Sequence, residues 1–408
     1  MAIPPQLNCT PGRIDGESGM NAIKRTQSGL SLVEAMIAML IGSVIMVGVV
    51  QLLVANSETH KLMMGQSRMQ ESARFSLDFI ARTVRQAGYR GCFSSNAALN
   101  TTIDPPAALP YEYDLRFGVQ GYDASGANLW TPMLTNLPQT TSGGVDTNIY
   151  YQSLGTDTLT AQGQGQNNGI DIGAIVSGTD VLTVRNMDQQ DIEARIDALV
   201  GANNPIVVHV PPDGLNLLVN HMAVIHDCEK ATIFRVTSVA NDTPIANQMT
   251  IGHDTADVDA VRNSINTLAL RNFFGVDGAV TAIQSYTYFI APGTGQNAQG
   301  ATPLSLWRKT GLTAPIELVE GVEDLQILYG VSTDDDITPN QYVAANSVAD
   351  WKDVTTIRIT VVVNSVDDVG GTSVPTQTCA VQTCIPDVNY DGLIRRSFTQ
   401  TIKLRNTS

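Results

Sequence analysis

The sequence has few charged residues and no excess of basic ones. Only 15 % of its 408 residues are charged, and 39 acidic residues against 24 basic ones give a net charge of −15. Because no basic surplus exists to displace the counterions of a phosphate backbone, we expect no direct binding to nucleic acid. With 43 % apolar residues, the chain is neither a disordered tail nor a polytopic membrane protein.

Residue patterns that carry catalysis are also missing. The five histidines show no metal-ligand spacing such as H-E-x-x-H, and no G-x-S-x-G nucleophile elbow occurs. The stretch from Gly293 to Gly300 has glycines but no following lysine, so it does not indicate a phosphate-binding loop. His226 and Cys228 would share one face of a strand, and disulfide pairing of the cysteine is favoured over thiolate chemistry. We predict no enzymatic activity; an anchored periplasmic enzyme would need a catalytic constellation that the sequence does not show.

One uninterrupted apolar run is present, from Ala35 to Val54. Its 20 residues hold no charge and are about as long as a helix that crosses a bilayer. Lys24 and Arg25 precede the run, so we expect the amino end to stay cytoplasmic and the bulk of the chain to lie outside. The alternative is an ordinary cleaved signal or signal anchor, with a small-residue cleavage site at Ala55.

Glu34 stands at the cytoplasmic edge of this run and requires a partner. A carboxylate inside a membrane costs about 2.5–3.5 kcal/mol even on lenient scales. Cleavage after Gly29 would supply a positive α-amino group on Leu30. The order of residues, a glycine and an apolar residue before Ser-Leu-Val-Glu and then the apolar run, resembles the type III signal of type IV pilins and pseudopilins.

The resemblance implies several roles for these residues. Gly29–Leu30 would be the bond cut by a prepilin peptidase, with Leu30 standing where the family usually has Phe. The new terminus would be N-methylated, and Glu34 would neutralise the terminal amine of a neighbouring subunit during assembly. Residues 1–29 would be the leader, and we place the true start at Met20 because the ten residues from there have the usual leader length.

A single long helix is expected over residues 30–87. No proline occurs between Leu30 and Tyr89, and Gly88 is a plausible terminator. The helix would be about 87 Å long, with 35–54 as its transmembrane half. The second half is amphipathic and would dock on a globular head. Its apolar positions recur at helical spacing: Leu62, Met69, Ala73, Leu77, Ile80, Val84 and Ala87. The alternative is a membrane anchor followed by a separate juxtamembrane helix.

Residues 88–408 are predicted to form a periplasmic or extracellular head rich in β-structure. Strand-like runs alternate there with Gly, Asn, Asp and Pro turns. The best candidates for helices are Asp191–Val200 and Asp257–Ala269, and residues 135–178 should form a loop-rich insertion. The fold class is therefore α+β, a long N-terminal helix packed on a largely antiparallel sheet. Predicted strands are Val181–Arg185, Ile206–Val210, Met222–Ile225, Ile233–Val239, Tyr286–Ile290, Leu304–Arg308, Leu325–Tyr329, Thr356–Val363 and Ser397–Leu404.

Several segments together resemble the PilW family of minor pilins. Two of them are the HDCEKATIFRV stretch from His226 and the LVEGVEDLQILYG stretch from Leu318. Others are residues 69–92, 304–308, 351–358 and 395–406. The resemblance implies a minor pilin that joins other minor pilins and the major pilin and primes pilus assembly. It would sit first in the inner membrane, with its head in the periplasm, and then at the pilus tip, where a tip adhesin would be a further partner.

Two rival functions remain open. Minor pseudopilins of the J type in type II secretion share the GVEDLQ region, and neighbouring genes would separate the two systems. A surface-binding module is the other, with residues 93–215 engaging a ligand directly. In the minor-pilin interpretation, effects on twitching motility or cell adhesion would be indirect.

Four cysteines remain after the leader: Cys92, Cys228, Cys379 and Cys384. An even number in a periplasmic domain indicates disulfides, and three pairings are possible. We predict Cys92–Cys228, tying the helix end to what we take to be a core strand, and Cys379–Cys384, closing a short loop. Free or redox-active thiols are the alternative.

Asp387, Asn389 and Asp391 follow the opening D-x-N-x-D-G pattern of a calcium loop. Alternating oxygen side chains and a glycine turn can wrap a hard cation. The twelfth position is Phe398 rather than the closing Glu of an EF-hand, and no helix pair flanks the loop. Some pseudopilins hold calcium in a carboxyl-terminal loop, so calcium is retained as a hypothesis beside an Asx-rich turn without metal. No other cofactor is expected.

Overall fold

The chain divides into two compact units, Met1–Ser57 and Glu58–Ser408. The computed structural model describes residues 31–92, 98–104, 111–126, 129–131, 175–187, 194–196, 205–209, 217, 219, 221–241, 247–254, 262–263, 274–311, 314–334, 338–369, 378–380, 383–385 and 392–406. The insertion expected at 135–178 thus lies almost wholly outside the described residues.

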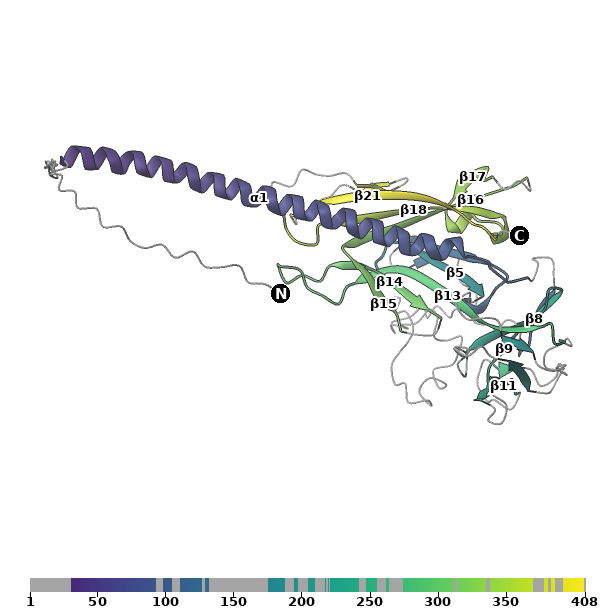
Figure 1. Cartoon of the computed structure of the whole chain (residues 1–408). Coiled ribbons are helices and arrows are strands. Elements are labelled where there is room, and N and C mark those ends of the chain that lie inside the picture. Colours follow the sequence, from purple (N-terminus) through teal and green to yellow (C-terminus); the bar gives the residue numbers. More distant parts are fainter. Residues whose placement is uncertain are drawn as a thin grey trace, which may run out of the picture. The chain divides into compact units, whose positions relative to one another are not determined.

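One α-helix and mostly antiparallel strands make up the described structure (Figure 1). The elements are α1 (Leu32–Arg85), β1 (Ala98–Thr101), β2 (Ile103–Asp104), η2 (Tyr111–Tyr113), β3 (Val119–Gly126), β4 (Leu129–Thr131), β5 (Val181–Met187), β6 (Ala194–Ile196), β7 (Ile206–His209), β8 (Met222–His226), β9 (Lys230–Arg235), β10 (Ser238–Asn241), β11 (Gln248–Gly252), β12 (Arg262–Asn263), β13 (Ala279–Pro292), β14 (Leu304–Thr310), β15 (Ile316–Glu320), β16 (Val322–Val331), β17 (Gln341–Val343), η4 (Ala345–Ser347), η5 (Trp351–Asp353), β18 (Val354–Asn364), β19 (Thr378–Ala380), β20 (Thr383–Ile385) and β21 (Arg395–Lys403).

Helix α1 runs unbroken through the predicted range. It begins where the Ser31 hydroxyl accepts from the Glu34 amide at 3.1 Å, an N-cap bond that satisfies one free donor of the first turn. It ends before Gly88, whose φ of +71° is the left-handed conformation that glycine adopts most readily. The Gly88 amide then donates to the Arg185 carbonyl at 2.9 Å. The helix is therefore one element, not an anchor followed by a separate helix.

The second half of α1 packs between two sheets of the head. Met69, Ala73, Ile80, Val84 and Ala87 are buried as the spacing predicts, whereas Leu62 is 38 % exposed. On one side lie β16, β18 and β21 of a four-stranded antiparallel sheet, and on the other lie β5, β13 and β14.

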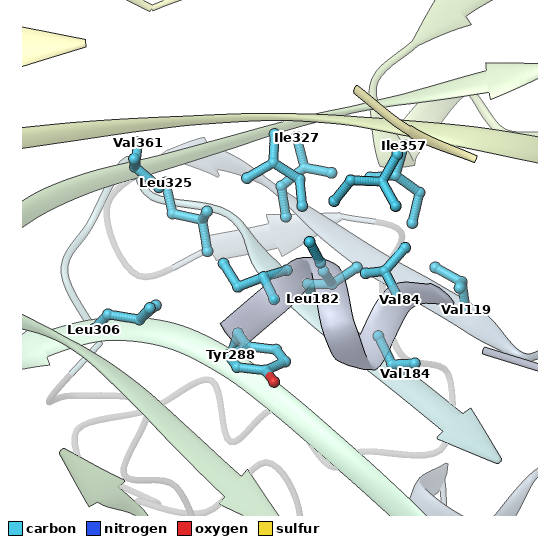
Figure 2. Close-up of a cluster of buried hydrophobic side chains, with 14 of the residues drawn as sticks. Val84, Val119, Leu182, Val184, Tyr288, Leu306, Leu325, Ile327, Ile357 and Val361 are labelled. Carbon is cyan, nitrogen blue, oxygen red and sulfur yellow. The ribbon is translucent and has the colours of Figure 1, made fainter. Parts of the chain in front are cut away.

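Val84 illustrates this packing. Figure 2 shows it between Ile327 and Ile357 of the four-stranded sheet and Val184 of β5. The second half of the helix thereby forms the centre of the largest hydrophobic core among the described residues, rather than a surface layer.

Strand β13 links the two parts of the larger sheet. Its first residues, Ala279–Ala282, pair with β8, and Ala279 and Val280 also pair with β6 on the opposite edge. Residues 283–292 pair instead with β5 and β14. A second core lies among β7, β8, β11 and β13, and a third between β5, β8 and β9. The α+β class, with largely antiparallel sheets, is confirmed.

The two predicted helices of the head are wrong at the few residues of each range that the structure describes, 194–196 and 262–263. Within Asp191–Val200 the structure has strand β6, which pairs with β7 and β13. Within Asp257–Ala269 it has strand β12, which pairs with β2. Both segments are short, and ladder bonds to neighbouring strands outweigh the weak helical periodicity of an isolated stretch.

The predicted strands are found, with one break. The run Ile233–Val239 is divided into β9 and β10, because the Val236 amide donates to the His221 carbonyl and the Thr237 amide to the Gly252 carbonyl. The chain thus changes neighbours at this point and leaves the ladder of β8 to pair with β11.

Candidate functional site

The first turn of α1 holds the one predicted assembly residue that the structure describes. Glu34 lies in this turn with its side chain exposed, and its amide donates to the Ser31 hydroxyl. The Ala35 amide donates to the Ser31 carbonyl at 3.1 Å, which closes the first helical bond. A carboxylate in the first turn also interacts favourably with the helix dipole. Gly29 and Leu30 lie outside the described residues.

The helical stretch after Glu34 is apolar and unburied. Among the described residues, α1 is the one helix long and apolar enough to cross a membrane, judged by length and composition, and its most apolar stretch has no buried residue. Leu32 and Met39 are 77 % and 76 % exposed. Apolar surface of this extent requires a cover of lipid or of other helices.

The structure joins Cys92 to Cys228, the pairing favoured from the sequence. The two Cα atoms lie 5.0 Å apart and 136 residues apart in the chain. Cys228 is not on a core strand as expected; it lies exposed in the turn between β8 and β9. The bond therefore fixes the turn after α1 to the tip of a hairpin.

The other predicted site residues are described only in part or not at all. Cys379 on β19 is the register partner of Cys384 on β20. Their side chains lie outside the described residues, so this disulfide stays a prediction. Asp387, Asn389 and Asp391 are not described either, and the calcium hypothesis is untested. Among the residues that are described, no three His, Cys, Asp or Glu side chains gather closely enough to hold a metal ion.

A buried carboxylate that the sequence did not reveal connects strands of the two sheets around α1. Asp180 is 3 % exposed, and its two oxygens accept from the Ala124 amide at 3.1 Å and the Ile327 amide at 2.8 Å. Burial raises the pKa of Asp180 to about 7 against these two bonds, and the charges of Asp123 and Asp324 raise it further. A Thr-Asp pair before a strand looks like an ordinary turn, so no sequence signal marked it.

A second buried polar group is an ion pair in the same half of the head. The Lys309 ammonium lies 3.2 Å from the Glu112 carboxylate, with side chains 3 % and 1 % exposed. It also donates to the Gly311 carbonyl at 2.5 Å. Burial lowers the pKa of Lys309, and Glu112 opposes that shift. The pair ties η2 to β14 and has no open surface for chemistry.

Comparison with known families gives two matches. Residues 287–406 match the model of the Type IV Pilus-assembly protein W family, and residues 24–50 match the Prokaryotic N-terminal methylation motif. The first range holds all four strands of the sheet β17-β16-β18-β21. The second range holds the start of α1 with Glu34. No curated protein and no solved structure matches the chain.

Proposed function

The chain belongs to the PilW family of type IV pilus-assembly proteins and carries an N-terminal methylation motif, and from this we propose that it is a minor pilin that primes assembly at the pilus tip. The family is a structural pilin family, generally not enzymatic. The motif implies processing by a prepilin peptidase, and the family implies other pilins as partners.

The observation that carries the proposal is the unburied apolar half of α1. The stretch begins at a capped turn containing Glu34, and the described part of the chain buries no residue of its most apolar window. An element of this kind suits two successive environments, since a bilayer and a bundle of like helices both bury an apolar cylinder. A protein that passes from the inner membrane into a filament needs both.

Processing at Gly29–Leu30 is the first proposal to test. The intact mass and amino-terminal sequence would be determined for the full chain made with and without its prepilin peptidase. We expect a mature chain that starts at Leu30 with a methylated amine, seen only when the peptidase is present. A chain cut near Ala55, or the same product without the peptidase, would show an ordinary signal or anchor instead.

Glu34 is proposed to pair with the terminal amine of a neighbouring pilin. Replacing Glu34 by Gln removes the charge with little change in shape, so the amine would be buried without a counter-charge. We expect incorporation into pili to fall roughly tenfold or more, while cleavage is retained. Glu58, an exposed glutamate on the same helix, supplies the control E58Q, which should assemble normally. Equal incorporation of both variants would contradict the proposed role.

Tip location and priming require an assay in cells. We expect deletion of the gene to reduce pilus number, and an epitope on the head to label pilus ends in electron micrographs. Labelling along the whole fibre would contradict a tip position. Loss of protein secretion with normal pili would instead indicate a type II pseudopilin. An adhesin above the protein is a proposed further partner, to be sought by cross-linking.

A further inference from the structure

A pocket of about 310 Å³ lies where α1 ends in the head. Its walls come from the turn after the helix, the segment before β3, the short helix η5 and the end of the chain. The close approach of its walls depends on two glycines. Gly88 has a positive φ, and a Cβ on Gly118 would collide with the Gly88 backbone. The Asn406 amide group donates to the Ala87 carbonyl at 3.2 Å and holds the chain end in place. The pocket is thus a feature built by four separated segments.

The lining of this pocket is positive in an acidic protein. Its 14 residues include Arg90, Arg116 and Lys352 but no Asp or Glu, although the chain has 39 acidic residues. Arg116 is held by Asp114 at 2.7 Å. Within the described part of the chain, Arg90 and Lys352 form no ion pair, although the charge of Asp114 also acts on Arg90, so this one carboxylate balances one of the three cations. Two cationic charges therefore remain to attract an anion.

Arg90 is fixed before any ligand arrives. Its guanidinium donates to the carbonyls of Leu115 and Arg116, at 2.6 and 3.0 Å. Such preorganisation lowers the entropic cost of binding. Lys352 is exposed at the rim, so it can reach an entering group without a change in the backbone.

Aromatic side chains provide the apolar part of the lining. Trp351 lies edge-on to Tyr329, with ring centroids 4.9 Å apart, which fixes the indole plane. Phe117 also lines the pocket, with the Arg116 guanidinium 5.8 Å from its ring centroid. The volume is at the small end of the range for ligand pockets, roughly 300–1,000 Å³.

We propose that this pocket binds a small organic carboxylate with an apolar face, of the size and chemistry of a single acidic sugar ring. The carboxylate would lie toward Arg90 and Lys352, and the ring face would lie against Trp351. The inference does not depend on the proposed pilin role, because it rests only on residues of the head.

The test is a titration of the full chain in detergent with glucuronate, followed by tryptophan fluorescence and by calorimetry. Glucose, which lacks the carboxylate, and acetate, which lacks the ring, are titrated at the same ionic strength because exposed charges are screened by salt. We expect saturable binding of glucuronate and markedly weaker binding of the other two. No response to glucuronate, or an equal response to acetate, would overturn the proposal.

Variants locate the binding. K352Q should weaken glucuronate binding roughly fivefold to tenfold, as expected for one charged hydrogen bond. The matched control is K403Q, which alters an exposed lysine on β21 outside the pocket and should bind as the parent does. W351F should remove the fluorescence response and weaken the calorimetric affinity. Unchanged affinity in both K352Q and W351F would place the binding elsewhere and refute the assignment.

Discussion

Loss of the Cys92–Cys228 disulfide should destabilise the head strongly. A cross-link restricts the unfolded chain, and the entropy it removes grows with the logarithm of the closed loop. For the 136 residues between the two cysteines, this relation gives about 5 kcal/mol at 25 °C. Residual structure in the unfolded chain reduces the effect, so we expect a loss of about 3–5 kcal/mol.

The assay is urea unfolding of the full chain in detergent, with tryptophan fluorescence as the signal. For a large domain, the expected loss lowers the unfolding midpoint by roughly 1–2 M urea. Both sulfur-bearing residues lie exposed, so mild reduction of the parent should have the same effect. Changing Cys379 and Cys384 to Ser is the comparison, because a bond closing so short a loop contributes only about 2 kcal/mol by the same relation.

Single variants provide the refutation. If the bond restrains the unfolded chain, C92S and C228S each abolish it and should match the double variant. Additive losses from the two single changes would mean that the cysteines act through packing and not through a bond. A double variant within about 1 kcal/mol of the parent would refute the entropy argument for this loop.

Three further predictions concern the core and its buried charges. I80A should lower the free energy of unfolding by about 2–5 kcal/mol because Ile80 is fully buried, whereas F75A, at a 48 % exposed site on the same helix, should lower it far less. Equal losses in urea titrations would show that α1 is not docked on the head. The pKa of Asp180 is raised to about 7, so its contribution to stability is full below about pH 4 and is lost as the pH rises through about 7. D180N should flatten this pH dependence of the melting temperature. An unchanged profile would show that another group causes it. K309M should lower the free energy of unfolding by about 3–5 kcal/mol, because the Glu112 carboxylate would be buried without its counter-charge. Restoration of the melting temperature on adding E112Q would show that the unpaired charge is the cause.

The sequence was sufficient for the long helix because every local signal agreed there. The absence of proline, the apolar run, the amphipathic repeat and Gly88 all indicated one element, and α1 differs from the predicted range by two residues at each end. The Cys92–Cys228 pairing was preferred among three possible pairings and is present, although Cys228 lies in a turn and not on the expected core strand. The residues before the helix, and the motif of 24–50, could be interpreted without any tertiary contact.

Short segments in the head were a different case. Ala194–Ile196 has no strong period of its own, and its strand conformation comes from the partners β7 and β13 on either side. Cys228 is in a turn because β8 ends two residues earlier, at His226, a boundary that local composition does not mark. Neither feature could be obtained without the sheet.

The functional features of the amino-terminal helix can be identified from the sequence alone. Its apolar stretch, its cap and its glutamate are defined by residues that are neighbours in sequence. The buried Asp180 and the basic pocket are set by residues far apart in the chain. Asp180 meets Ile327 across 147 positions, and the pocket joins the end of α1 to Asn406. Only folding brings such groups close together. Burial and neighbouring groups, and not residue type, decide whether the pKa of a carboxyl is raised and whether several cations form a site.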